Sequence, residues 1–169
     1  MDVLSSQSLA KPPRSLAVAS ALLFVIATAT ILVALAFEHL GGYAACPLCL
    51  QQRYAYYFAV PASAAALLFA RGQAPGIART MLVLIALAFI GNAVAGVYHA
   101  GIEWKWWEGP GTCAGAFELE WSEGGIVDTP VIRCDEASWR FLGLSFAGWN
   151  VAISSVLAGL AAYGATRRS

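Results

Sequence analysis

The chain has 169 residues, of which 59% are hydrophobic and only 12% carry a charge, and its formal net charge is zero. About a quarter of the residues of a soluble domain are charged, so this composition excludes an ordinary soluble protein. The balanced charge gives no sign of nucleic-acid binding, and we expect no nucleic-acid partner.

Four long apolar segments follow one another along the chain, at about residues 15–37, 52–70, 77–98 and 146–165. Each has about 19–23 residues, which at about 1.5 Å per residue is enough to cross the hydrocarbon layer of a membrane. The first is longer than the core of about 7–15 residues in a cleaved signal peptide, so we interpret it as a membrane span. The pattern predicts an all-α fold: one domain over residues 1–169, forming an antiparallel four-helix bundle in the lipid bilayer.

All four cysteines lie in two predicted outer loops, at residues 38–51 and 99–145. The outer side has four Lys or Arg residues and nine acids. The other side, formed by both termini and the turn near residues 71–79, has six Lys or Arg residues and one acid. Because Lys and Arg concentrate on the cytoplasmic side of membrane proteins, we expect both termini in the cytoplasm. The cysteines then face outward, where disulfides persist.

The first cysteine pair, Cys46-Pro-Leu-Cys49, lies where an outer loop leads into the second apolar segment. A C-x-x-C pair is typical of redox or metal chemistry. Pro47 suits the first position of a helix, which puts Cys49 at the third, beside backbone N–H groups that stabilise a thiolate. Cys46, Cys49 and Arg53 then share one helix face, and we expect Arg53 to favour the Cys49 thiolate further.

Arg53 has two interpretations, because an arginine inside an apolar segment is costly unless it has a partner or reaches the membrane surface. It either extends to the surface and marks the end of the span, or contacts an oxygen atom of a ligand. A small apolar redox ligand with carbonyl oxygens in a membrane is a quinone. Reduction of a quinone by a dithiol needs a thiolate beside the ring and a positive group near the developing charge.

His99 closes the third segment on the same outer side. It either hydrogen-bonds the quinone or relays protons at neutral pH, or it is a capping residue at the membrane surface.

The second cysteine pair, Cys113 and Cys134, is separated by 20 residues of polar loop. Gly109-Pro110-Gly111 indicates a flexible approach to Cys113. The pair is interpreted as an exchangeable disulfide or as a structural staple of the loop. A zinc site made by all four cysteines fits poorly, because such sites usually repeat a short cysteine spacing, and we expect no metal.

Together these motifs resemble the bacterial disulfide bond formation protein B (DsbB) family of quinone-linked thiol oxidases. The matching stretches are Cys46-Pro-Leu-Cys49-Leu-Gln-Gln-Arg53, Tyr98-His99-Ala-Gly-Ile-Glu103-Trp104, Gly109-Pro110-Gly-Thr-Cys113, and Cys134 to Leu144 leading into Ala147-Gly148-Trp149-Asn150.

The resemblance implies a protein-disulfide:quinone oxidoreductase in the bacterial inner membrane, with its cysteines in the periplasm. Such an enzyme reoxidises a periplasmic thioredoxin-like dithiol oxidase of the DsbA type and passes the electrons to ubiquinone or menaquinone in the quinone pool. By position, Cys113 would form the mixed disulfide with the partner, and Cys134 would connect the loop pair to Cys46. Cys49 would face the quinone, with Arg53 beside it and His99 assisting.

Two other functions compete with this one. A reductant exporter would run the same chemistry in reverse, but it needs electrons from the inner side, which has no cysteine. A membrane chaperone or transporter subunit would use the cysteines only as structural disulfides. Transporters usually have polar groups midway along their spans, and here only Asn92 and scattered Ser and Thr residues are available. The quinone-linked oxidase is therefore the leading hypothesis.

Overall fold

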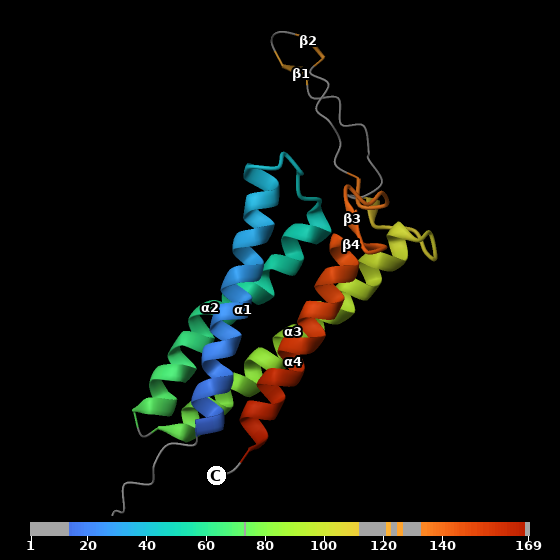
Figure 1. Cartoon of the computed structure of the whole chain (residues 1–169). Coiled ribbons are helices and arrows are strands. Elements are labelled where there is room, and N and C mark those ends of the chain that lie inside the picture. The colour runs from blue at the N-terminus through green and yellow to red at the C-terminus, as the bar shows by residue number, and fades with distance from the viewer. Residues whose placement is uncertain (1–13, 73, 112–120, 123–124, 127–132, 168–169) are drawn as a thin grey trace, which may run out of the picture.

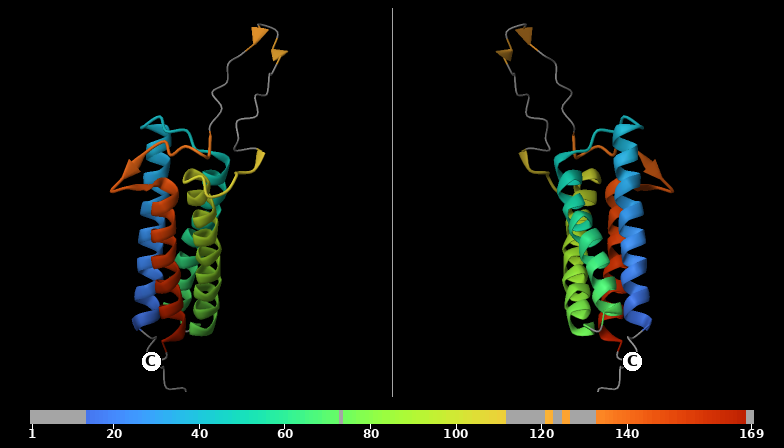
Figure 2. Two further views of the ribbon diagram at one scale, coloured as in Figure 1. Left: turned by 90° about the vertical axis from the view of Figure 1, so that its right-hand side faces the viewer. Right: turned by 90° about the vertical axis from the view of Figure 1, so that its left-hand side faces the viewer.

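The computed structural model describes residues 14–72, 74–111, 121–122, 125–126 and 133–167. Four helices run alternately up and down in one bundle (Figure 1). They are α1 (Arg14–His39), α2 (Pro47–Arg71), α3 (Pro75–Glu103) and α4 (Phe146–Thr166). The start of α1 and the end of α4 lie at the same end of the bundle (Figure 2). The predicted all-α membrane bundle is confirmed: α1, α3 and α4 are long and apolar enough to cross a membrane.

Two helices extend beyond the apolar segments that the sequence shows. α2 begins at Pro47 rather than near residue 52, and α3 continues to Glu103 rather than ending near residue 98. The apolar run marks only the part of a helix that suits hydrocarbon, whereas backbone hydrogen bonds continue through the polar residues on either side. The Cys46 side chain caps α2 by accepting the backbone N–H of Cys49. Both extensions lie at the same end of the bundle, opposite the start of α1 and the end of α4 (Figure 2).

Two short hairpins accompany the helices, and the sequence did not predict them. β1 (Trp121–Ser122) pairs with β2 (Gly125–Ile126), and β3 (Arg140–Phe141) pairs with β4 (Leu144–Ser145), both antiparallel. Leu142 and Gly143 between β3 and β4 both have positive φ, 52° and 82°. A two-residue turn of this kind matches the twist of the strands it joins. The second hairpin leads directly into α4.

The helices pack unequally around the bundle, and the contact between α1 and α4 is the smallest between neighbours. α3 packs on α2 and on α4, α1 packs on α2, and the contact between α1 and α4 is smaller. The core is built of small and aliphatic side chains such as Leu23, Ala59 and Leu82, all fully buried. Large apolar side chains also cover the outside of the bundle, as expected where lipid replaces water.

Gly96 allows α3 and α4 to approach closely beside the polar centre of the bundle. A Cβ atom at this position would lie 2.8 Å from Cγ2 of Val151 and 3.2 Å from Nδ2 of Asn150. We expect Gly96→Ala to destabilise the protein by about 1–3 kcal/mol, because one of the helices must shift. Unfolding of the purified protein in mixed micelles measures this. Gly91→Ala on the same helix is the control, since no described atom outside its own stretch of helix lies within 4 Å of its Cβ position. Equal losses in both variants would contradict the prediction.

Candidate active site

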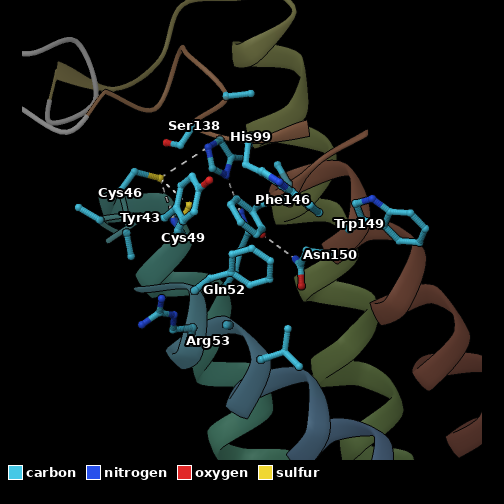
Figure 3. Close-up of a pocket in the computed structure, with 18 of the residues that line it drawn as sticks. Tyr43, Cys46, Cys49, Gln52, Arg53, His99, Ser138, Phe146, Trp149 and Asn150 are labelled. Atoms are coloured by element: carbon cyan, nitrogen blue, oxygen red, sulfur yellow. Dashed lines mark hydrogen bonds between the residues drawn. The ribbon is translucent and has the colours of Figure 1, made fainter. Parts of the chain in front are cut away.

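An apolar pocket of about 410 Å³ lies at the end of the bundle where α2 begins and α3 ends, and where α1 and α4 face each other. Aromatic side chains from three parts of the chain line it, among them Phe37, Tyr43, Trp139, Phe146 and Trp149. Phe37, Trp139 and Phe146 are in mutual ring contact, with ring centroids 5.0–5.2 Å apart. A few polar and sulfur-containing side chains reach the same pocket from α2, α3 and α4 (Figure 3). The pocket is therefore suited to a flat, largely apolar ligand with a small number of polar atoms.

The first cysteine pair lies on this pocket as two free thiols. The sulfurs of Cys46 and Cys49 are hydrogen-bonded at 2.8 Å, and Cys46 Sγ also accepts the backbone N–H of Cys49 at 3.2 Å. Nε2 of His99 lies 3.6 Å from the same sulfur. The hydrogen bond with the Cys49 thiol, together with His99, lowers the pKa of Cys46 well below its ordinary value. The backbone N–H that the sequence analysis assigned to Cys49 thus serves Cys46, because Cys46 is the residue that caps the helix.

This arrangement predicts that Cys46 of the reduced protein reacts with an alkylating agent at a pH below the ordinary thiol pKa of 9.0. A folded-state pKa below the unfolded value also stabilises the reduced fold. That stabilisation is present above the unfolded pKa and is lost as the pH falls through the folded pKa. Mass spectrometry of alkylated peptides across a pH series measures the midpoint for each cysteine. A Cys46 midpoint at or above 9.0 would contradict the prediction.

A chain of amide and hydroxyl groups continues from the thiols into the bundle. Gln52 Nε2 donates to His99 Nδ1 at 3.0 Å, and Asn150 Nδ2 donates to Gln52 Oε1 at 2.6 Å. Asn150 Oδ1 then accepts from the Tyr56 hydroxyl at 2.9 Å and from Asn92 Nδ2 at 3.1 Å. Because Nδ1 of His99 accepts a hydrogen bond, the hydrogen of the neutral ring belongs on Nε2, the nitrogen that faces Cys46. We call these residues, Gln52, Tyr56, Asn92 and Asn150, the amide chain.

Arg53 lines the pocket, but its guanidinium forms an ion pair with Glu38 of α1. The Arg53 side chain is 12% exposed and that of Glu38 is 25% exposed. The ion pair offsets the cost of placing an arginine near hydrocarbon. Neither interpretation from the sequence named Glu38 as the partner of Arg53. Arg53 therefore lies beside the thiol pair with a fixed partner and holds α1 against α2 at the pocket.

Glu103, at the end of α3, also reaches the pocket. Its side chain is 4% exposed, and Oε1 lies 3.9 Å from Nε2 of His99. Oε2 is buried without a hydrogen-bond partner among the residues that the structure describes.

The second cysteine pair is placed only in part, because Cys113 lies outside the described residues. Cys134 is disulfide-bonded and 1% exposed. It is buried together with Cys46, and Leu48 and Cys49 pack against the two. The loop on which Cys134 lies is thus held directly over the first pair.

Asp135 fixes this loop against the end of α3. It accepts hydrogen bonds from Arg133 at 2.8 and 2.9 Å and from Lys105, which follows α3. The bonds with Arg133 and Lys105 hold the pKa of the Asp135 carboxyl well below its usual range. They tether the residue next to Cys134 to the segment that follows α3.

The structure brings Cys46, Cys49, Arg53 and His99 to one pocket, and their roles stay predictions. Sequence reasoning missed Gln52, Asn150 and Glu103. The signals were weak but present: Gln52 lies one turn after Cys49, Asn150 is an amide in an apolar segment, and Glu103 lies one turn after His99.

A metal ion is the other ligand that these side chains could hold. Cys46, Cys49 and His99 each bring one donor atom, and these atoms lie within 4.8 Å of one another. The sequence predicts redox thiols at this place and no metal site, and that stays a prediction.

Comparison with known proteins gives two matches. The family model described as "Disulfide bond formation protein DsbB" matches residues 16–164, which include all of the pocket. The chain is 31% identical over 161 residues to the "Disulfide bond formation protein B" of Marinobacter nauticus, covering 87% of this chain and 90% of that protein. No solved structure matches the chain significantly.

Proposed function

We propose a route for the electrons that starts from one premise: the chain belongs to the DsbB family. The family reoxidises DsbA and passes the electrons to a quinone in disulfide bond formation, so this chain is a multi-pass membrane disulfide:quinone oxidoreductase. The family assignment decides against a reductant exporter and against a protein whose cysteines are only structural. What we propose is which residues of this chain carry the electrons, and in what order.

The observation that carries the proposal is the burial of Cys134 against Cys46. A thiolate of the reduced partner attacks Cys113 of the loop disulfide, forming a mixed disulfide and releasing Cys134 as a thiolate. Cys134 then attacks Cys46 of the Cys46–Cys49 disulfide and releases Cys49. The second partner thiol closes the partner's own disulfide and frees Cys113, which attacks Cys134 and releases Cys46. Two electrons have then moved from the partner to the pair at the pocket.

The thiol pair next gives its two electrons to a quinone, and the Cys46–Cys49 disulfide closes again. The residues fit such a ligand: aromatic walls match a flat ring, and an arginine, a histidine and a free thiol reach the same space. The pocket also extends to Val33, which is 55% exposed on the outside of α1. We propose that the head group of ubiquinone or menaquinone enters there from the bilayer, with Cys49 facing the ring and Arg53 and His99 beside it.

We further propose that the four helices cross the bacterial inner membrane as a single domain, within the segments 15–37, 52–70, 77–98 and 146–165. Both termini are cytoplasmic and all four cysteines periplasmic, as the Lys and Arg distribution supports. The partner is then a periplasmic thioredoxin-like oxidase of the DsbA type. Reporter fusions that place the two cysteine pairs on opposite sides of the membrane would contradict this topology.

A trapping experiment tests the order of the electron transfers. The purified protein should consume a quinone when it is supplied with reduced DsbA. DsbA that lacks its second active-site cysteine should remain bound to the protein as a mixed disulfide, because the bond cannot be resolved. Peptide mapping should locate that bond at Cys113. A bond at Cys46 alone would overturn the proposed order.

A further inference from the structure

The Glu103 carboxyl group has no role in the route just proposed, although it is buried beside the thiols. Its side chain is 4% exposed, and Oε2 has no hydrogen-bond partner within the described ranges of the chain. A buried carboxylate oxygen without a partner destabilises a protein, so such a group in a pocket of this kind calls for a chemical explanation.

His99 is poorly placed to take a proton from the thiols itself. Its Nδ1 accepts from Gln52, and the Gln52 amide is held in that orientation by Asn150, which donates to Oε1. The hydrogen of the ring is therefore on Nε2, between Cys46 Sγ at 3.6 Å and Glu103 Oε1 at 3.9 Å. A nitrogen that already carries its hydrogen cannot accept a second one, but it can donate to either neighbour.

Cys46 and Glu103 therefore lie on two sides of one N–H group. Two negative charges at these positions would repel each other strongly, because the pocket is apolar and shields charges weakly. The other charged or titratable groups that act on Glu103 are His99 on its own helix and Arg140 on β3. Cys49 faces it from α2, while Arg53 is engaged by Glu38. The apolar pocket therefore favours one negative charge, on either Cys46 or Glu103, over two negative charges.

We propose that Glu103 is the proton acceptor for Cys46, so that the two groups share one negative charge across the Nε2–H of His99. When the Cys46 thiol loses its proton, the Glu103 carboxylate becomes a carboxylic acid, and the N–H of His99 turns from the carboxylate to the thiolate. The Cys46–Cys49 bond closes as the two sulfurs give two electrons to the quinone, and Cys46 gives up its electrons as a thiolate rather than as a thiol. This inference rests on the proposed function and adds a residue to it.

The protons and electrons balance over the cycle. Closing the Cys46–Cys49 bond releases two electrons to the quinone and leaves two protons in the pocket. One of them was on the Cys49 thiol and the other is on Glu103, and both leave with the reduced product. Glu103 returns to the carboxylate.

Glu103→Gln tests the proposal, because it keeps the shape of the side chain and removes its ability to accept a proton. Quinone reduction should fall by about 100-fold, the usual contribution of a positioned acid or base, because glutamine cannot hold the Cys46 proton and pass it to the reduced product. Alkylation of Cys46 in the reduced protein should instead shift to lower pH, because no carboxylate opposes the thiolate. Damage to the pocket would not slow turnover and at the same time make the thiol more acidic. Glu103→Asp should restore most of the rate.

Glu108→Gln is the matched control, since Glu108 is exposed and lies outside the pocket; both readouts should equal those of the unmodified protein. An unchanged rate in Glu103→Gln would overturn the inference. So would a lower rate with an unchanged alkylation midpoint, because Glu103 would then only support the fold. If the unmodified protein reduces quinone without needing Cys49, the proposed function fails first; if Cys49 is needed and Glu103→Gln behaves normally, only this inference fails.

Discussion

Cys49→Ser is expected to abolish electron transfer to quinone, with turnover reduced by more than about 1,000-fold. The variant cannot form the Cys46–Cys49 disulfide, so electrons that reach Cys46 have no further route. A serine hydroxyl can still donate a hydrogen bond to Cys46 Sγ, and the backbone N–H of residue 49 remains. The fold and the cap of α2 should therefore survive. Steady-state consumption of quinone with reduced DsbA measures the loss.

The same variant also reveals where the electrons stop. Because Cys134 lies against Cys46, oxidation of the Cys49→Ser protein should collect a disulfide between these two residues. Peptide mapping without reduction detects it. Ser155→Ala, at an exposed position of α4, is the control for turnover. Unimpaired turnover in Cys49→Ser, or a Cys46 that stays free in the oxidised variant, would refute the proposed order.

Asn150→Leu should have the largest effect on stability, with a loss of about 3 kcal/mol in the free energy of unfolding. Asn150 is the only described residue that joins Gln52 to Tyr56 and Asn92 through hydrogen bonds. Leucine would leave Gln52 Oε1 without its donor and the hydroxyl of Tyr56 without its nearest acceptor. An exposed side chain would replace a lost hydrogen bond with one to water, but Gln52 and Tyr56 lie within the bundle. Unfolding in mixed micelles measures the difference.

The loss of Asn150 should also slow quinone reduction, because the Gln52 amide would be free to rotate away from His99. Ser155→Ala again provides the control, since the Ser155 hydroxyl donates to the backbone of its own helix and bonds to no other residue in the described part of the chain. A loss in Asn150→Leu no greater than in the control would show that the amide chain contributes little to stability.

Much of the architecture could be read from the sequence, because α1, α3 and α4 each contain an apolar run that is long enough to cross a membrane. The two thiols and Arg53 were also visible, since their spacing places them on one face of a helix. What could not be read is the contact between distant segments. Gln52 meets Asn150 across 98 positions of the chain, and no local pattern indicates such a pair.

Other differences have local causes. Helical spacing predicts the stabilised thiolate at Cys49, but the Cys46 side chain caps the helix and accepts the backbone N–H itself. Arg53 had two interpretations, and its pairing with Glu38 depends on how α1 lies against α2. The β3–β4 hairpin has only two residues in each strand, too few for an alternating pattern to show.

The cap of α2 links the oxidation state of the Cys46–Cys49 pair to the order of the first turn of this helix. The sulfur that holds the first turn of this helix, Cys46 Sγ, is also one of the two atoms that gain and lose electrons in every cycle. A disulfide sulfur is a weaker acceptor than a thiolate, so the opening turn should loosen on oxidation and tighten on reduction. Protection of the Cys49 amide from deuterium exchange should therefore be greater in the reduced protein than in the oxidised protein.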